Sequence, residues 1–122
     1  MEHYKSVKDF LEDYPCRFSC RWVGERTDGL MGSDMNHYKV VITHNKKQMS
    51  FFFSQGYGIT TDPTLERVIE CVSSDAVAGE MGLEEFCREY GYGLEGIKIH
   101  RACRATRDKW IRVFGEVVSI YF

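Results

Sequence analysis

Hydrophobic residues recur along the chain with two different periods, one typical of strands and one typical of helices. Every second residue is apolar in the runs Arg17–Val23, His37–His44 and Gln48–Ser54, which predicts three half-buried strands. The polar segment Asn45–Lys47 joins the last two runs and predicts a β-hairpin. The residues predicted to face the core are Phe18, Cys20, Trp22, Tyr38, Val40, Ile42, Met49, Phe51 and Phe53.

Helical spacing occurs near the N-terminus and again in the second half of the chain. Ser6 can cap a short helix that Pro15 ends. Asp62 and Pro63 predict the start of a second helix, with Asp62 as the N-cap and Pro63 in the first helical position. Its apolar stripe fades before Gly79 and consists of Leu65, Val68, Ile69, Val72 and Ala76.

Two more helices are predicted over Leu83–Tyr90, which Gly91 would end in a left-handed conformation, and over Ile97–Phe114. The state of the apolar segment 117–122 is left undecided. Because the strands precede most of the helices, we expect an α+β fold. It would have a short N-terminal helix and a three-stranded antiparallel sheet, followed by three helices packed on one face. The apolar stripe of the last helix is Ile99, Cys103, Thr106, Trp110 and Val113.

Length and composition predict one domain over residues 1–122, because 122 residues with 43% hydrophobic and 28% charged side chains suit a single core. No segment approaches the roughly 20 apolar residues that cross a bilayer, and the first ten residues lack the apolar centre of a signal peptide. We therefore expect a cytoplasmic protein. In that compartment the five cysteines would be reduced thiols: Cys16, Cys20, Cys71, Cys87 and Cys103.

No catalytic motif occurs in the sequence. Cys16 and Cys20 are four positions apart, but the other cysteines are isolated, which does not suit a zinc site. The adjacent acids, such as Glu84 and Glu85, fall at helix positions that face solvent. We expect no enzyme, no metal and no cofactor. A pocket that gathers His37, His44 and cysteine thiols would instead favour a small enzyme or metal-binding protein.

Charge is divided strongly along the second half of the chain. Residues 62–95 include nine acidic and two basic residues, whereas residues 98–112 include six basic residues and one acidic residue. The basic residues of the last helix surround its apolar stripe, so they could be a solvated surface, a nucleic-acid contact or a contact for an acidic protein. The candidate partner-binding residues on this helix are Lys98, Arg101, Arg104, Arg107 and Arg112.

Residues Gly24–Asn36 contain three glycines and show no periodicity, so they predict a long loop. Leu30, Met31 and Met35 lie in this loop, and exposed methionines suit an adaptable binding surface. The alternative is a loop that folds back and covers the edge of the sheet.

Several short segments together resemble a group of small proteins encoded by bacteriophages and prophages. They are His37–Val40 (HYKV), Met49–Gly56 (MSFFFSQG), Asp62–Thr64 (DPT), Ser73–Ala76 (SSDA) and Phe86–Tyr92 (FCREYGY). The resemblance spans residues 22–114 and implies a non-enzymatic accessory protein in the bacterial host cytoplasm. Such a protein would bind a host protein or ribonucleoprotein, for example to inhibit a defence system such as CRISPR-Cas. A nucleic-acid-binding protein that uses the basic helix remains the alternative.

Overall fold

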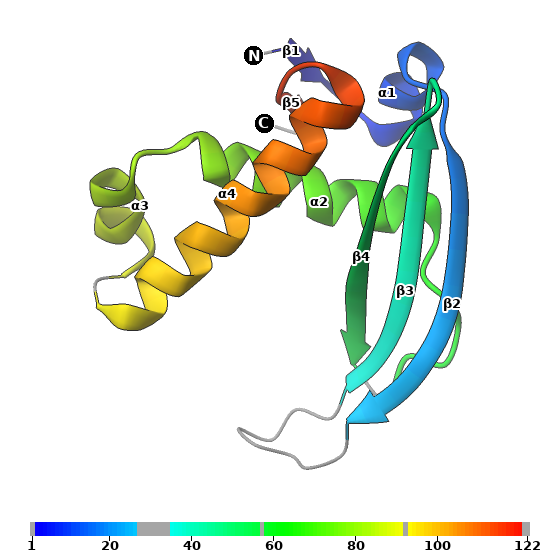
Figure 1. Ribbon diagram of the computed structural model, residues 1–122, viewed down its shortest axis with the longest axis horizontal. Coiled ribbons are helices and arrows are strands. Elements are labelled where there is room, and N and C mark those ends of the chain that lie inside the picture. The colour runs from blue at the N-terminus through cyan, green and yellow to red at the C-terminus, as the bar shows by residue number, and fades with distance from the viewer. Residues whose placement is uncertain (1, 27–34, 57, 92, 121–122) are drawn as a thin grey trace.

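The structure is a computed structural model that describes residues 2–26, 35–56, 58–91 and 93–120 (Figure 1). The helices are α1 (Val7–Asp13), α2 (Leu65–Glu80), α3 (Leu83–Tyr90) and α4 (Leu94–Phe114). The strands are β1 (Glu2–Tyr4), β2 (Arg17–Arg26), β3 (Met35–His44), β4 (Lys47–Gly56) and β5 (Val118–Ile120). The α+β class is confirmed, because β2, β3 and β4 form a three-stranded antiparallel sheet accompanied by four helices.

The sheet follows the predicted hydrophobic alternation except at Trp22, which was predicted to face the core but is 54% exposed. Tyr38, Val40 and Ile42 are buried on the face of β3 that meets the helices, and Met49 of β4 lies opposite Ile42. The hairpin turn consists of Asn45 and Lys46, whose φ angles of 48° and 67° suit a two-residue turn between right-twisted strands. Lys47, which was predicted to belong to the turn, is already in β4.

Both ends of the predicted loop Gly24–Asn36 belong to strands. β2 continues to Arg26 and β3 begins at Met35, because a bulge between Trp22 and Gly24 shifts the register and allows pairing to continue. Met35 is therefore a half-buried strand residue rather than a loop residue. The two remaining loop candidates, Leu30 and Met31, lie outside the described residues.

The main core lies between the sheet and the helices α1, α2 and α4. Trp110 of α4 is fully buried, with its ring centroid 5.5 Å from that of Phe10 and 4.6 Å from that of Phe114. In Figure 1, α3 lies away from the strands, at the far end of the molecule. The buried residues of α3 form a second, smaller cluster with Cys103 of α4, so α3 packs on α4.

Two helix starts differ from the prediction. The N-cap of α2 is Thr64, not Asp62, because the Thr64 hydroxyl accepts a hydrogen bond from the Arg67 backbone N–H at 3.2 Å. Pro63 therefore precedes the cap. The helix α4 begins at Leu94, three residues before the predicted Ile97.

The helices α2 and α4 approach each other closely at Gly79. A Cβ atom at this position would lie only 2.4 Å from the backbone oxygen of Cys103. The fading of the apolar stripe before Gly79 thus marks a close helix crossing, where a side chain would not fit.

The segment whose state was left undecided contains β5, which pairs in parallel with β1. Tyr4 lies opposite Ile120 in this ladder, and both side chains are buried. The two strands have three residues each, which is too short for their periodicity to be recognised in the sequence.

Candidate binding surfaces

The five candidate basic residues of α4 divide into two groups. Arg107 forms an ion pair with Glu80 of α2 and a second with Asp108 at 3.0 Å. The hydrogen bond with Glu80 is the main reason that the pKa of Arg107 rises above its usual value. Arg104 donates a hydrogen bond to the Gly79 carbonyl oxygen at 3.3 Å. These two arginines therefore connect α4 to α2.

The other group consists of Lys98, Arg101 and Arg112, which are exposed. Within the described part of the chain, none of the three forms a salt bridge. For these three cations, a role in binding a partner stays a prediction.

The first half of α4 carries more exposed apolar surface than predicted. Ile99 was assigned to the buried stripe, but it is 48% exposed. His100 is buried in its place, and its Nε2 donates to the Met81 carbonyl oxygen at 2.8 Å. The burial of His100 was not predicted from the sequence.

We call residues 83–91 and 93–103, which comprise α3 and the first half of α4, the helical arm. In Figure 1 the helical arm extends away from the sheet. Among the described residues, eight large hydrophobic side chains are exposed, and half of them belong to the arm. They are Leu83, Tyr90, Leu94 and Ile99.

The histidines and cysteines do not form one polar pocket. His37 and His44 lie at opposite ends of β3, where His37 Nδ1 is 2.7 Å from Ser54 Oγ and His44 Nδ1 donates to the Pro15 carbonyl oxygen at 2.8 Å. Burial raises the pKa of the Cys16 thiol to about 11, so this thiol is protonated at neutral pH and is a weak nucleophile. In the ranges that the structure describes, no three His, Cys, Asp or Glu side chains are grouped to hold a metal ion.

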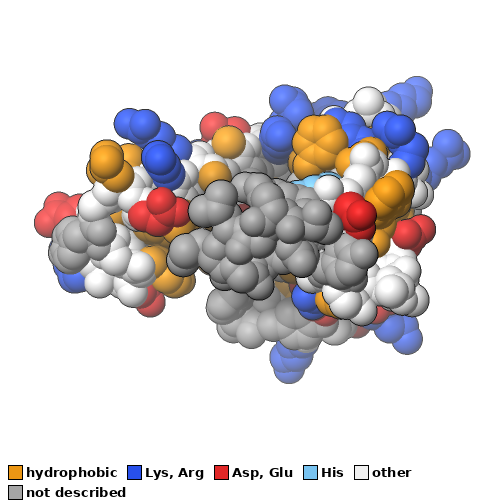
Figure 2. All heavy atoms as spheres, turned by 90° about the horizontal axis from the view of Figure 1, so that it is seen from below, with side chains coloured by type: hydrophobic (Ala, Val, Ile, Leu, Met, Phe, Trp, Pro, Cys, Tyr) orange, Lys and Arg blue, Asp and Glu red, His pale blue; other side chains and the backbone are white. Residues whose placement is uncertain are grey.

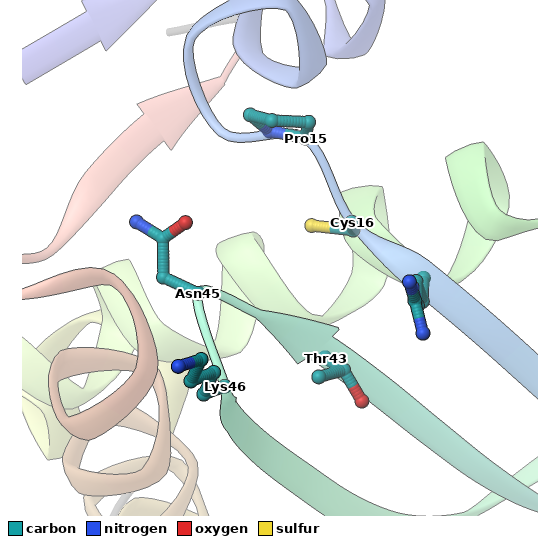
Figure 3. Close-up of a pocket in the computed structure, with 6 residues that line it drawn as sticks. Pro15, Cys16, Thr43, Asn45 and Lys46 are labelled. Atoms are coloured by element: carbon teal, nitrogen blue, oxygen red, sulfur yellow. The ribbon is translucent and has the colours of Figure 1, made fainter.

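A hollow of about 530 Å³ lies at the hairpin end of the sheet. Figure 3 shows the Cys16 thiol and the Asn45 side chain on opposite sides of it, with Thr43 and Lys46 nearby. Arg17 completes the lining with Pro15. The hollow carries two cationic side chains and no carboxylate, so it favours an anionic ligand.

The side of β2, β3 and β4 that faces away from the core is a third candidate surface, which we call the outer sheet face. No described helix or strand covers it, and its residues on β2 and β4 are exposed. The pairing register places Arg21, Lys39 and Phe52 in one row across the three strands. The Lys39 ammonium lies 4.8 Å from the centroid of the Phe52 ring, a cation–π distance.

The sequence itself contains a signal for this surface, namely basic and aromatic residues on the polar sides of the predicted strands. Arg17 and Arg21 occupy the polar side of their strand, and Phe52 occupies the polar side of its own strand between two serines. An aromatic residue on a solvent-facing strand position suggests a contact surface, because burial in the core does not account for it.

No family model, curated protein or solved structure matches this chain. The resemblance to small phage proteins therefore stays a prediction, and the surfaces described above are the basis for a functional proposal. In the described ranges, none of the helices combines the length and the apolar character that a membrane span requires.

Proposed function

We propose that this protein is a non-enzymatic binding protein of the phage accessory type, whose partner is a host protein or ribonucleoprotein. The observation that carries the proposal is the concentration of exposed hydrophobic side chains on the helical arm. Leu94 is 77% exposed and Tyr90 is 62% exposed. Because burial of apolar surface is favourable, covering these side chains with a partner would stabilise the complex. The arm therefore supplies the apolar contacts of the proposed interface.

The charged residues of the arm suit a protein surface of mixed charge. Glu84 and Arg88 form an ion pair at 3.5 Å along α3, while Lys98 and Arg101 of α4 are exposed. Apolar anchors surrounded by charges of both signs are typical of protein interfaces, in which the charges select the partner and its orientation. Lys98 and Arg101 are the cations that we assign to this interface.

The separation of the chemically reactive side chains supports a binding role over an enzymatic one. His37 and His44 have different partners at opposite ends of a strand, and burial raises the pKa of the thiols of Cys20 and Cys103 as well as that of Cys16. An enzyme would need such groups to converge on one pocket. In this proposal their roles are in packing.

The proposal is tested by capture of partners from a bacterial lysate with the purified, tagged protein. We expect a stoichiometric partner that is retained by the wild type and lost by the double variant Leu94→Gln/Ile99→Gln, because glutamine keeps the helix but removes the apolar contact. The matched control is Ile59→Gln, which removes a side chain that is 42% exposed from the loop after β4. A partner that binds the arm variant and the control equally well would contradict the proposal.

Inhibition of a defence system is the most specific part of the proposal. Expression of the protein in a strain with an active CRISPR-Cas system should raise the survival of a targeted plasmid. The arm variant should lose this protection, and Ile59→Gln should keep it. Protection that is retained by both variants would point to a different surface.

A further inference from the structure

We propose that the outer sheet face binds single-stranded nucleic acid, with Phe52 stacking on a base and Arg17, Arg21 and Lys39 contacting phosphates. This inference goes beyond the helical arm, because it assigns a second ligand to different residues. A protein that recognises a ribonucleoprotein could use both surfaces at once.

Charge on the outer sheet face is entirely positive. The outward residues within 17–21, 37–43 and 48–54 include Arg17, Arg21 and Lys39, and none of them is Asp or Glu. The whole chain has 18 acidic and 16 basic residues, so the balance of charge on this face differs from that of the chain as a whole. Figure 2 shows Lys and Arg side chains gathered around hydrophobic ones at the upper right, on the side where the strands lie, with Asp and Glu side chains below them. Such a surface attracts a polyanion.

The exposed aromatic ring distinguishes a nucleic acid from other polyanions. Phe52 is 68% exposed, and Lys39 holds a positive charge beside its ring. A nucleotide presents a planar base and a phosphate that are joined by a short sugar, so one nucleotide can use both side chains. An acidic polypeptide has carboxylates, but it has no planar base attached to each of its charged units.

The same ring favours single strands over duplexes. Bases in a duplex are already stacked on their neighbours, and only an unpaired base offers a free face to an aromatic side chain. Outward residues repeat about every 6.6 Å along a strand, and neighbouring strands are about 4.8 Å apart. The face is therefore a shallow platform several nucleotides long, and no described element projects from it to enter a groove.

The hollow at the hairpin extends this platform. Arg17 and Thr43 belong to both, because they face each other in the last row of the outer sheet face and also line the hollow. Lys46 adds a fourth cation on the far side. A single-stranded nucleic acid that passes Phe52 and Lys39 and continues toward Arg17 would thus have a phosphate site in the hollow.

The test measures binding of a fluorescent oligo-dT and an oligo-U of roughly 20 nucleotides to the full chain by fluorescence anisotropy at several salt concentrations. Four phosphate contacts predict a log-log salt slope of about −3, at about 0.7 per single-strand contact. An unlabelled single strand should compete. Equal competition by a duplex of the same length, or by polyglutamate, would overturn the assignment, as would the absence of binding at low salt.

Variants locate the site. Phe52→Ala should weaken binding about tenfold, since one stacked base contributes about 1.4 kcal/mol or more, and Phe52→Tyr should restore it because the aromatic face returns. The double variant Arg21→Gln/Lys39→Gln should reduce the salt slope by about 1.4. The matched control Lys98→Gln/Arg101→Gln removes equal charge from the helical arm and should leave the slope unchanged. The reverse pattern would place the nucleic acid on α4 instead.

These results are separable from those of the arm proposal. Leu94→Gln/Ile99→Gln should bind the oligonucleotides normally, whatever happens to partner capture. Thermal unfolding of each variant confirms that the fold is intact. If Phe52→Ala and Phe52→Tyr bind equally well at unchanged stability, stacking on the outer sheet face is wrong.

Discussion

Replacement of Gly79 by alanine tests the close approach of α2 to α4. The added Cβ would lie 2.4 Å from the oxygen and 2.8 Å from the carbon of the Cys103 carbonyl, and 2.9 Å from Arg107 Cβ. Two of these three atoms belong to the backbone of α4, which packs on the core through Trp110. Because a backbone cannot move aside as a flexible side chain does, the two helices must separate.

The expected destabilisation follows from two opposing effects. Overpacking of this kind costs about 1–3 kcal/mol, and backbone contacts place Gly79→Ala near the upper end. Alanine is more favourable than glycine in a helix interior by about 1 kcal/mol, which offsets part of this cost. The net loss is therefore about 2 kcal/mol. For a chain of 122 residues, this loss lowers the melting temperature by roughly 8 °C.

The assay is thermal and urea unfolding followed by far-ultraviolet circular dichroism. The control is Gly58→Ala, because a Cβ at Gly58 would meet nothing within 4 Å. We expect the control to keep or slightly raise the melting temperature, since alanine restricts the unfolded chain. If Gly79→Ala melts at or above the temperature of the control, the close approach of α2 and α4 is wrong.

Two further substitutions test the core and its charge. Trp110→Ala should cost about 3–5 kcal/mol in urea unfolding, because a fully buried indole is lost, and a cost under about 1 kcal/mol would contradict its place in the core. Asp75 is an exposed residue that lines a hollow between β4, α2 and α4, where partial desolvation raises the pKa of its carboxyl. A raised pKa means that the folded protein holds the proton more tightly, so stability is full below the unfolded pKa and falls as pH rises through the folded pKa. Asp75→Asn should therefore stabilise the protein at pH 7 and lose this advantage near pH 4, and an advantage that is independent of pH would contradict the desolvation argument.

The sequence predicted the elements that carry a long periodic pattern. The hairpin of β3 and β4 and the helix α3 were located closely, because apolar residues recur at a regular spacing in each of these segments. In α3, however, only Phe86 and Cys87 are buried, whereas Leu83 and Tyr90 are exposed. The capping of α1 by Ser6 was also correct, since its hydroxyl accepts the Asp9 backbone N–H at 3.1 Å. These features depend on neighbours along the chain, which a sequence shows directly.

The features that were missed depend on residues far apart in the sequence. The ladder between β1 and β5 joins Glu2 to Val118, and each strand alone is too short to show a pattern. Ile99 is exposed because of where α4 leaves the core, which no helical wheel can show. The row of Arg21, Lys39 and Phe52 likewise exists only through the strand register. Surfaces formed by residues of several strands therefore could not be predicted from the sequence and were found only in the structure.

The ladder between β1 and β5 also constrains when the protein can finish folding. β1 is synthesised before every other described element and β5 after all of them. Bringing together two strands separated by a chain segment of this length costs about 4 kcal/mol of conformational entropy. Contacts that form earlier reduce this cost, because they bring the two strands close to each other. While β5 is still inside the ribosome, the paired edge of β1 stays open to other chains. We therefore expect a nascent chain stalled before Val118 to be far more sensitive to proteases and aggregation than the released protein.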